Sequence, residues 1–230
     1  MSSVFQGQPP RVSIMDYDTK ETVYYEADRQ DMHRFIPTGV STHLDIGCGQ
    51  GAFGKGLKQK FPRLESWGLE LSKTEGKIAK KNLDKAIIGT IEDNLKELPD
   101  GYFDVISFND VLEHLVDPYE VLCLLQPKLS PNGVVVASIP NVRFVRNLVN
   151  LLIKKDWTYE NGGILDRTHL RFFTYKTMRD MFEKCGYRVE TLEGISQIAK
   201  WKATLLTLVS LGQLRDTTFI QYAVVARPRR

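Results

Sequence analysis

The residues best suited to chemistry in this chain are three closely spaced glycines with an acidic residue on either side. Gly47, Gly49 and Gly51 close a short apolar run and open a helix-like stretch. Glycines let the backbone turn sharply and approach a ligand closely, and the first turn of a helix presents unpaired N–H groups. Asp45 precedes the loop, and Glu70 ends the next strand-like run about twenty residues on, where a carboxylate accepts hydrogen bonds from ribose hydroxyls. This spacing predicts a nucleoside-binding loop.

Two kinds of ligand fit such a loop. Gly49, Gly51 and Gly54 match the GxGxxG pattern of dinucleotide-binding proteins, which would make the chain a nucleotide-binding oxidoreductase. The carboxylate of Asp45 would repel a pyrophosphate, whereas it suits a ligand with an ammonium and a sulfonium group. S-adenosylmethionine carries both groups and has no phosphate. We therefore expect S-adenosylmethionine and keep the oxidoreductase as an alternative.

Three further patterns follow in order along the chain: GLELS at 68–72, FDVISFNDVLEHL at 103–115 and LSPNG at 129–133. Together with the glycine loop they resemble the class I S-adenosylmethionine-dependent methyltransferases, from Tyr24 to the end of the chain. The resemblance implies that Glu70 binds the ribose and that residues 89–93 lie near the adenine, although Thr90 stands where many members have aspartate. The residues that it implies for the cofactor are Tyr25, Arg29, Asp45, Gly47, Cys48, Gly49, Gly51, Glu70, Leu71, Ile91, Glu92, Asn109, Asp110 and His114.

The acceptor-binding residues are expected between 163 and 174, where charged side chains and a histidine lie among aromatic residues. This segment and residues 24–29 resemble the subgroup associated with bacterial surface-polysaccharide and other sugar pathways. The resemblance implies O-methylation of a sugar or a similar small polar acceptor, with Arg29 near the methionine carboxylate. His169 is the candidate general base, since imidazole titrates near neutral pH, and Asp166 orients it or binds a hydroxyl. A structural, hydrogen-bonded histidine is the other interpretation of His169.

Two apolar segments leave other acceptors and partners open. Residues 141–155 combine basic and large apolar side chains, and residues 201–214 are apolar at helical spacing. They support an alternative in which the acceptor is a quinone or a lipid-like molecule, and the first segment could lie on a membrane surface. We favour a lid helix or a contact in a homodimer. A binding module that keeps the cofactor but has lost activity is a further alternative.

The elements that position these residues alternate between strand-like and helix-like runs, which predicts βαβ units. Strands are expected at Thr42–Ile46, Trp67–Leu71, Ala86–Ile88, Phe103–Phe108, Val134–Ile139, Tyr187–Leu192 and Phe219–Ala226. We therefore expect an α/β fold: a doubly wound, mostly parallel seven-stranded sheet with helices on both faces, an antiparallel C-terminal edge strand, and a helical lid insertion at about 142–174. Residues 1–23 are expected to be a flexible leader and residues 24–230 a single domain.

Composition and charge exclude several classes of protein. Of the 230 residues, 42% are hydrophobic and 26% charged, which is typical of a globular chain rather than a disordered one. A formal net charge of +3 is too small to indicate nucleic acid binding. Cys48, Cys123 and Cys185 lie far apart, so we expect a reducing compartment, and no cluster of residues has convincing metal-ligand spacing. Without an apolar signal core or a membrane-length apolar run, the expected location is the cytoplasm and the expected partner a small-molecule substrate.

Overall fold

Seven strands form one sheet in the order β3-β2-β1-β4-β5-β7-β6. The computed structural model describes residues 28–229, so the expected leader and the predicted cofactor residue Tyr25 lie outside the described residues. The strands are β1 (Thr42–Ile46), β2 (Glu65–Glu70), β3 (Lys85–Ile88), β4 (Phe103–Asn109), β5 (Leu129–Pro140), β6 (Tyr187–Gln197) and β7 (Phe219–Pro228). Strands β1 to β5 are parallel to one another, and β7 is antiparallel to both β5 and β6. The predicted fold class is therefore confirmed.

The order of the last two strands follows from their side chains. In β7 the consecutive residues 222–226 are all buried, as a strand covered on both faces requires. In β6 most residues are partly or fully exposed, which suits the edge of a sheet. Strand β7 therefore inserts between β5 and β6 and runs antiparallel to both, and β6 forms the edge of the sheet.

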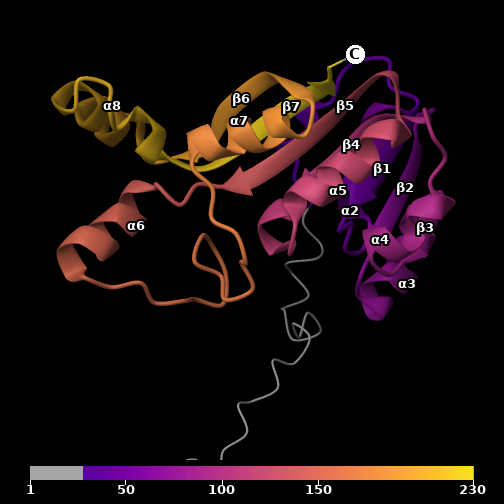
Figure 1. Cartoon of the computed structure of the whole chain (residues 1–230), viewed down its shortest axis with the longest axis horizontal. Coiled ribbons are helices and arrows are strands. Elements are labelled where there is room, and N and C mark those ends of the chain that lie inside the picture. The colour runs from indigo at the N-terminus through magenta and orange to yellow at the C-terminus, as the bar shows by residue number, and fades with distance from the viewer. Residues whose placement is uncertain (1–27, 230) are drawn as a thin grey trace, which may run out of the picture.

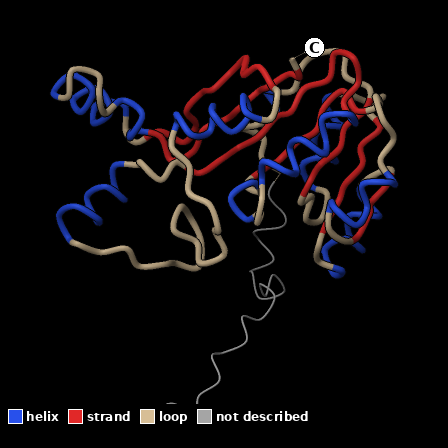
Figure 2. The backbone as a smooth tube through the Cα atoms, in the orientation of Figure 1, coloured by secondary structure: helices blue, strands red, loops and turns tan. Residues whose placement is uncertain are grey.

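Helices cover both faces of the sheet, as Figures 1 and 2 show. The longer helices are α2 (Ala52–Lys60), α3 (Lys73–Asn82), α5 (Pro118–Leu125), α7 (Tyr175–Lys184) and α8 (Lys200–Val209); α4 (Ile91–Asn94) and α6 (Val145–Val149) are short. Successive residues of β5 belong to different cores, because Val135 packs with α5 and α7 while Val134 and Val136 pack with α2. A near-continuous apolar run is what a strand between two such layers requires.

The chain between β5 and α7 departs from the alternating pattern. It holds α6, a π-helical turn η6 (Asn150–Lys154) and then a long irregular stretch, and isolated bridges join Glu160 to Asp166 and Asn141 to Phe173. Figure 1 shows α6 and α8 at the same end of the molecule, at the opposite end of the sheet from α3 and β3. Within residues 28–229, no helix has both the length and the apolar character needed to cross a membrane.

Candidate functional site

A cavity of about 510 Å³ lies at the carboxyl ends of the parallel strands β1, β2, β3 and β4. Ligands in doubly wound sheets bind at this edge, where the strand order reverses direction. The cavity lies within the range of volumes typical of small-molecule sites. Twelve of the predicted cofactor residues line it: Arg29, Asp45, Gly47, Cys48, Gly49, Glu70, Leu71, Ile91, Glu92, Asn109, Asp110 and His114.

The glycine loop after β1 is held open by the carboxylate of Glu70. Glu70 is buried at the end of β2, and its two oxygens accept from the amides of Gly49 and Ser72, each at 2.8 Å. Burial raises the pKa of Glu70, and these amide hydrogen bonds oppose that rise. The amides of Gly47 and Cys48 bond to the Leu69 carbonyl, which fixes the loop against β2. These contacts fix the shape of the loop.

Gly51 has a different place from the one predicted. It is not among the residues that line the cavity. Its φ of 80° caps the start of α2, and a Cβ there would meet Leu83 at 2.8 Å. The structure therefore gives Gly51 a packing and turn-forming role, whereas Gly47 and Gly49 form the wall.

Asp45 is connected to a buried chain of polar side chains that sequence reasoning missed. Ser107 Oγ donates to Asp45 Oδ1 at 2.6 Å, His43 Nε2 lies 2.8 Å from Ser107 Oγ, and His43 Nδ1 lies 2.9 Å from Ser66 Oγ. Since Ser107 donates to Asp45, it accepts from His43 Nε2, which leaves Nδ1 to accept from Ser66. Burial raises the pKa of Asp45 to about 7, and burial lowers the pKa of His43 to about 3. The only sequence signal is polar residues within otherwise apolar strands.

Arg29 closes one side of the cavity through contacts with three strands. Its guanidinium pairs with Asp110 after β4, and donates to Ser138 Oγ of β5 at 3.1 Å and Gln221 Oε1 of β7 at 3.3 Å. Gln221 also donates to Asp110 at 2.8 Å. Burial raises the pKa of Asp110, and the Arg29 charge opposes that rise. This network places a cation and a carboxylate side by side in the wall.

Asn109 provides a direct test of whether the cavity suits a polar ligand. Both atoms of its side-chain amide are buried and neither makes a hydrogen bond of ordinary geometry within the described residues, although the Asn109 side chain lies close enough to Asp45 to oppose the rise of its pKa. Buried amide atoms are costly to leave unpaired, so a ligand that pairs with them gains binding free energy. With Asp45 and Glu70 in the same wall, the donor and acceptor groups present suit a nucleoside with a cationic amino-acid tail.

The predicted catalytic residues lie on the stretch that follows η6. His169 is buried, its Nδ1 lies 2.9 Å from the Ile164 carbonyl oxygen, and its ring packs edge-on against His114 at 4.6 Å between centroids. Asp166 does not line the cavity; its Oδ1 accepts from the backbone and hydroxyl of Thr168, at 2.8 and 2.7 Å. The structure therefore brings His169 to the back of the cavity wall formed by His114, and gives Asp166 the role of holding a turn.

Glu113 is the neighbour of these histidines that sequence reasoning missed. Its backbone carbonyl accepts from Leu170 at 2.8 Å and Arg171 at 3.0 Å, and its side-chain Oε1 lies 3.9 Å from His169 Nε2. Together with His114 and His169 it forms a group of possible metal ligands, which we did not expect from the sequence. The apolar wall beside the group is also new: Val111, Leu115 and Val116.

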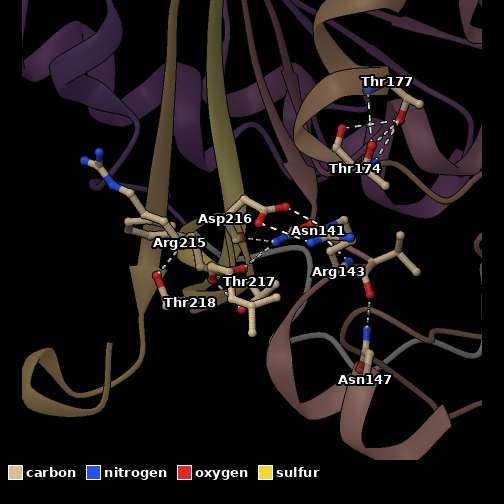
Figure 3. A network of polar contacts seen from close by, with 12 residues as sticks. Asn141, Arg143, Asn147, Thr174, Thr177, Arg215, Asp216, Thr217 and Thr218 are labelled. Carbon is tan, nitrogen blue, oxygen red and sulfur yellow. Dashed lines mark hydrogen bonds and ion pairs between the residues drawn. The ribbon is translucent and has the colours of Figure 1, made fainter. Parts of the chain in front are cut away.

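A polar network just after β5 fixes the start of the segment between β5 and α7, residues 141–174 (Figure 3). Asn141 is fully buried and donates to the Asp216 and Phe219 carbonyls at 2.8 and 3.0 Å. Arg143 Nε donates to Asp216 Oδ2 at 2.7 Å. At the other end Thr174 begins α7 in a reciprocal capping box with Thr177. Both ends of the stretch are therefore anchored to the sheet layers.

Comparison with known proteins gives consistent relatives. A family model described as a methyltransferase domain matches residues 21–192. The ubiquinone biosynthesis O-methyltransferase of Aeromonas salmonicida is 25% identical over 183 residues, which are 77% of this chain and 73% of that protein. The malonyl-[acyl-carrier protein] O-methyltransferase of Halalkalibacterium halodurans is 35% identical over 101 residues, 41% of this chain and only 37% of that relative.

Solved structures show the same fold. A SAM dependent methyltransferase from Archaeoglobus fulgidus superposes with a TM-score of 0.66 at 24% identity, over 90% of this chain and 94% of that one. PKMT2 from Rickettsia typhi, solved in complex with AdoHcy, superposes with a TM-score of 0.54 at 18% identity, over 82% of this chain and 48% of that one.

Proposed function

This chain belongs to the class I S-adenosylmethionine-dependent methyltransferases, and we propose that it transfers the methyl group to an oxygen atom of a small acceptor with a large apolar part. The observation that carries the proposal is the cavity at the carboxyl ends of β1 and β2, with Asp45 and Glu70 in one wall. S-adenosylmethionine supplies an electrophilic methyl group on a sulfonium, with a neutral thioether as the leaving group.

The residues of this cavity have three proposed roles: they bind the nucleoside, the amino-acid tail of the cofactor, and the acceptor. Glu70 accepts the ribose hydroxyls while it holds the loop, and Leu71 and Ile91 provide apolar surface for the adenine. Asp45 offers a carboxylate to the ammonium group of the amino-acid tail, and Arg29 offers a guanidinium to its carboxylate. The wall around His114 is left for the acceptor. Methyl transfer then requires an oxygen held in line with the departing sulfur, in a site from which water is excluded.

We assign the activation of the acceptor's hydroxyl group to the side chains around His114 and keep His169 in that group. His169 lies behind His114 in contact with its ring, and Glu113 lies beside both. Asp166 acts as a positioning residue, because its carboxylate fixes the turn whose Thr168 carbonyl oxygen lies 3.0 Å from His114 Nδ1. Of the predicted catalytic pair, His169 thus belongs to the proposed acceptor site and Asp166 supports it.

An apolar acceptor is favoured by the surface around the site. Val111, Leu115 and Val116 form an apolar wall next to His114, and Val116 is 74% exposed at the rim. Large apolar side chains are also exposed on the elements at one end of the molecule: Val149, Leu151, Leu152 and Ile153 on α6 and η6, and Trp201, Leu205, Leu208 and Val209 on α8. The name of the Aeromonas relative, a ubiquinone biosynthesis enzyme, supports the same class of acceptor.

A sugar acceptor is the second candidate, and one observation favours it. Trp157, Tyr159 and Phe172 form an aromatic group, with ring centroids 5.6 and 6.4 Å from Phe172. Half-exposed aromatic rings such as that of Tyr159 provide flat surfaces on which sugar rings stack.

Turnover with two acceptor panels tests the proposal. One panel holds phenols and catechols with alkyl or prenyl chains, and the other holds hydroxylated sugars and nucleotide sugars; the readout is S-adenosylhomocysteine release. We expect turnover with the first panel, and lower turnover by Val116→Asp than by the matched rim control Val116→Leu. Turnover confined to the second panel would transfer the proposal to sugars, and an absence of S-adenosylmethionine binding by calorimetry would refute both.

A further inference from the structure

Glu113, His114 and His169 form a buried cluster with the composition of a metal site. Their exposed fractions are 1%, 9% and 8%, and one nitrogen or oxygen from each lies within 4.8 Å of the others. No other group of three such residues was found in the part of the chain that the structure describes. The cluster joins two segments far apart in sequence, the turn after β4 and the stretch before α7.

The hydrogen bonds of both histidines fix the tautomer of each ring. His114 Nδ1 lies 3.0 Å from the Thr168 carbonyl oxygen, and His169 Nδ1 lies 2.9 Å from the Ile164 carbonyl oxygen. A carbonyl oxygen only accepts, so each Nδ1 must carry the proton, and in a neutral ring the lone pair is then on Nε2. Histidines that bind metal ions show this arrangement, in which a backbone carbonyl orients the ring and sets its tautomer.

The spacing of the cluster suits an ion. Glu113 Oε1 and His169 Nε2 lie 3.9 Å apart. Ligand atoms that each bind a divalent ion at about 2.0–2.2 Å are about 3–3.5 Å from one another, so a small side-chain rotation is enough to close the site. The backbones that carry these side chains are already joined, because Leu170 and Arg171 donate to the Glu113 carbonyl.

We propose that Glu113 and the Nε2 atoms of His114 and His169 bind a divalent transition-metal cation at the wall of the cavity. Two imidazoles and one carboxylate form a donor set that zinc, iron, manganese and cobalt accept, and three protein ligands leave coordination positions open. His114 lines the cavity, so the open side of the site faces the acceptor.

The role of the cation rests on the function proposed above. A cation beside the acceptor lowers the pKa of its hydroxyl, and the released proton passes to solvent. The oxygen then forms the new bond to the methyl carbon while the carbon–sulfur bond breaks, and the electron pair of that bond stays on sulfur. The positive charge of the sulfonium thus leaves as the released proton, and no oxidant or reductant is needed because the reaction only transfers a methyl cation from sulfur to oxygen.

Titration with Co²⁺ tests the site directly. The untagged full-length protein, first dialysed against a chelator, should bind one Co²⁺ with new visible absorption bands, and Zn²⁺ should displace it. His169→Ala and Glu113→Gln should weaken Co²⁺ binding by more than about 100-fold, beyond the 10–100-fold that changes in surrounding residues cost. His33→Ala is the matched control: it removes a histidine that faces Asp28, and it should leave Co²⁺ binding unchanged.

Calorimetry with S-adenosylmethionine on the same samples separates this inference from the proposed function. A wild-type protein that binds the cofactor but gives no cobalt bands would overturn the metal site and leave the methyltransferase proposal intact. Cobalt binding that survives in His169→Ala would equally overturn it. Cobalt binding without cofactor binding would instead refute the role given to Asp45 and Glu70. The wild-type spectrum decides the question even if a variant fails to fold.

Discussion

The ionisation of Asp45 should control how tightly the protein binds S-adenosylmethionine near neutral pH. Burial raises the pKa of this carboxyl to about 7, and the charge of Glu70 acts in the same direction, against the hydrogen bond from Ser107. The ammonium of the ligand prefers the ionised carboxylate. Affinity should therefore rise with pH through the range in which Asp45 loses its proton.

The size of the effect follows from that pKa. With a pKa of about 7, roughly one molecule in eleven is ionised at pH 6 and ten in eleven at pH 8, so the Kd should fall about tenfold between them. Calorimetric titration of wild type and Asp45→Asn at both pH values measures it. At each pH, dividing the Kd of Asp45→Asn by the Kd of the wild type cancels any effect of the ligand's own titration. Asp104→Asn, which changes a carboxylate near the opposite end of the sheet, is the matched control.

The result that would refute this reasoning is an Asp45→Asn variant whose Kd follows the wild type at both pH values. The ligand-free protein offers a second check. Since the folded-state pKa lies above 3.8, the stability that Asp45 contributes is present at low pH and is lost as pH rises towards 7. The loss is roughly 4 kcal/mol when ionisation is complete. Asp45→Asn should therefore melt at a higher temperature than wild type at pH 8, and this difference should shrink at pH 5.

Three further changes test the loop, the packing and a helix start. Glu70→Gln leaves one acceptor oxygen where two amides are now held, so S-adenosylmethionine affinity by calorimetry should fall about tenfold to 100-fold; unchanged affinity would contradict the loop geometry. Gly54→Ala places a Cβ 2.6 Å from Leu83 and should destabilise the fold by about 1–3 kcal/mol in urea unfolding, whereas Gly162→Ala, which meets nothing within 4 Å, should change it little. Asp117→Ala removes the carboxylate that caps α5 and should cost about 1 kcal/mol; an equal midpoint in urea would argue against that cap.

The sheet and most of the residues that line the cavity could be predicted because their signals are local. A buried strand, a glycine turn and a helix follow one another within residues 42–60, and each part is visible in its own residues. The sequence could not show that Gly51 lies outside the cavity lining, because a glycine that caps a helix and a glycine that faces a ligand have the same local pattern. The packing of Leu83 decides between them, and that contact is not local.

The buried chain of polar side chains behind Asp45 and the cluster of Glu113, His114 and His169 could not be predicted, because both depend on the register between segments far apart in sequence. Ser107 reaches Asp45 only because β1 and β4 pair these two residues directly. His169 reaches Glu113 because the backbones of residues 170 and 171 bond to the Glu113 carbonyl, 56 residues away in sequence from His169. The sequence suggested a catalytic role for Asp166 because it lies close to His169, but the short side chain of an aspartate is equally well suited to stabilising a turn.

The two hydrogen bonds that Leu170 and Arg171 donate to the Glu113 carbonyl also limit how new specificities can be engineered. A graft that replaces residues 142–174 with the same stretch from a relative would exchange one side of the proposed acceptor site. The grafted segment is positioned correctly only if the turn at 112–116 places the Glu113 carbonyl where residues 170 and 171 can donate to it. Such an exchange should therefore succeed when residues 112–116 are replaced together with residues 142–174.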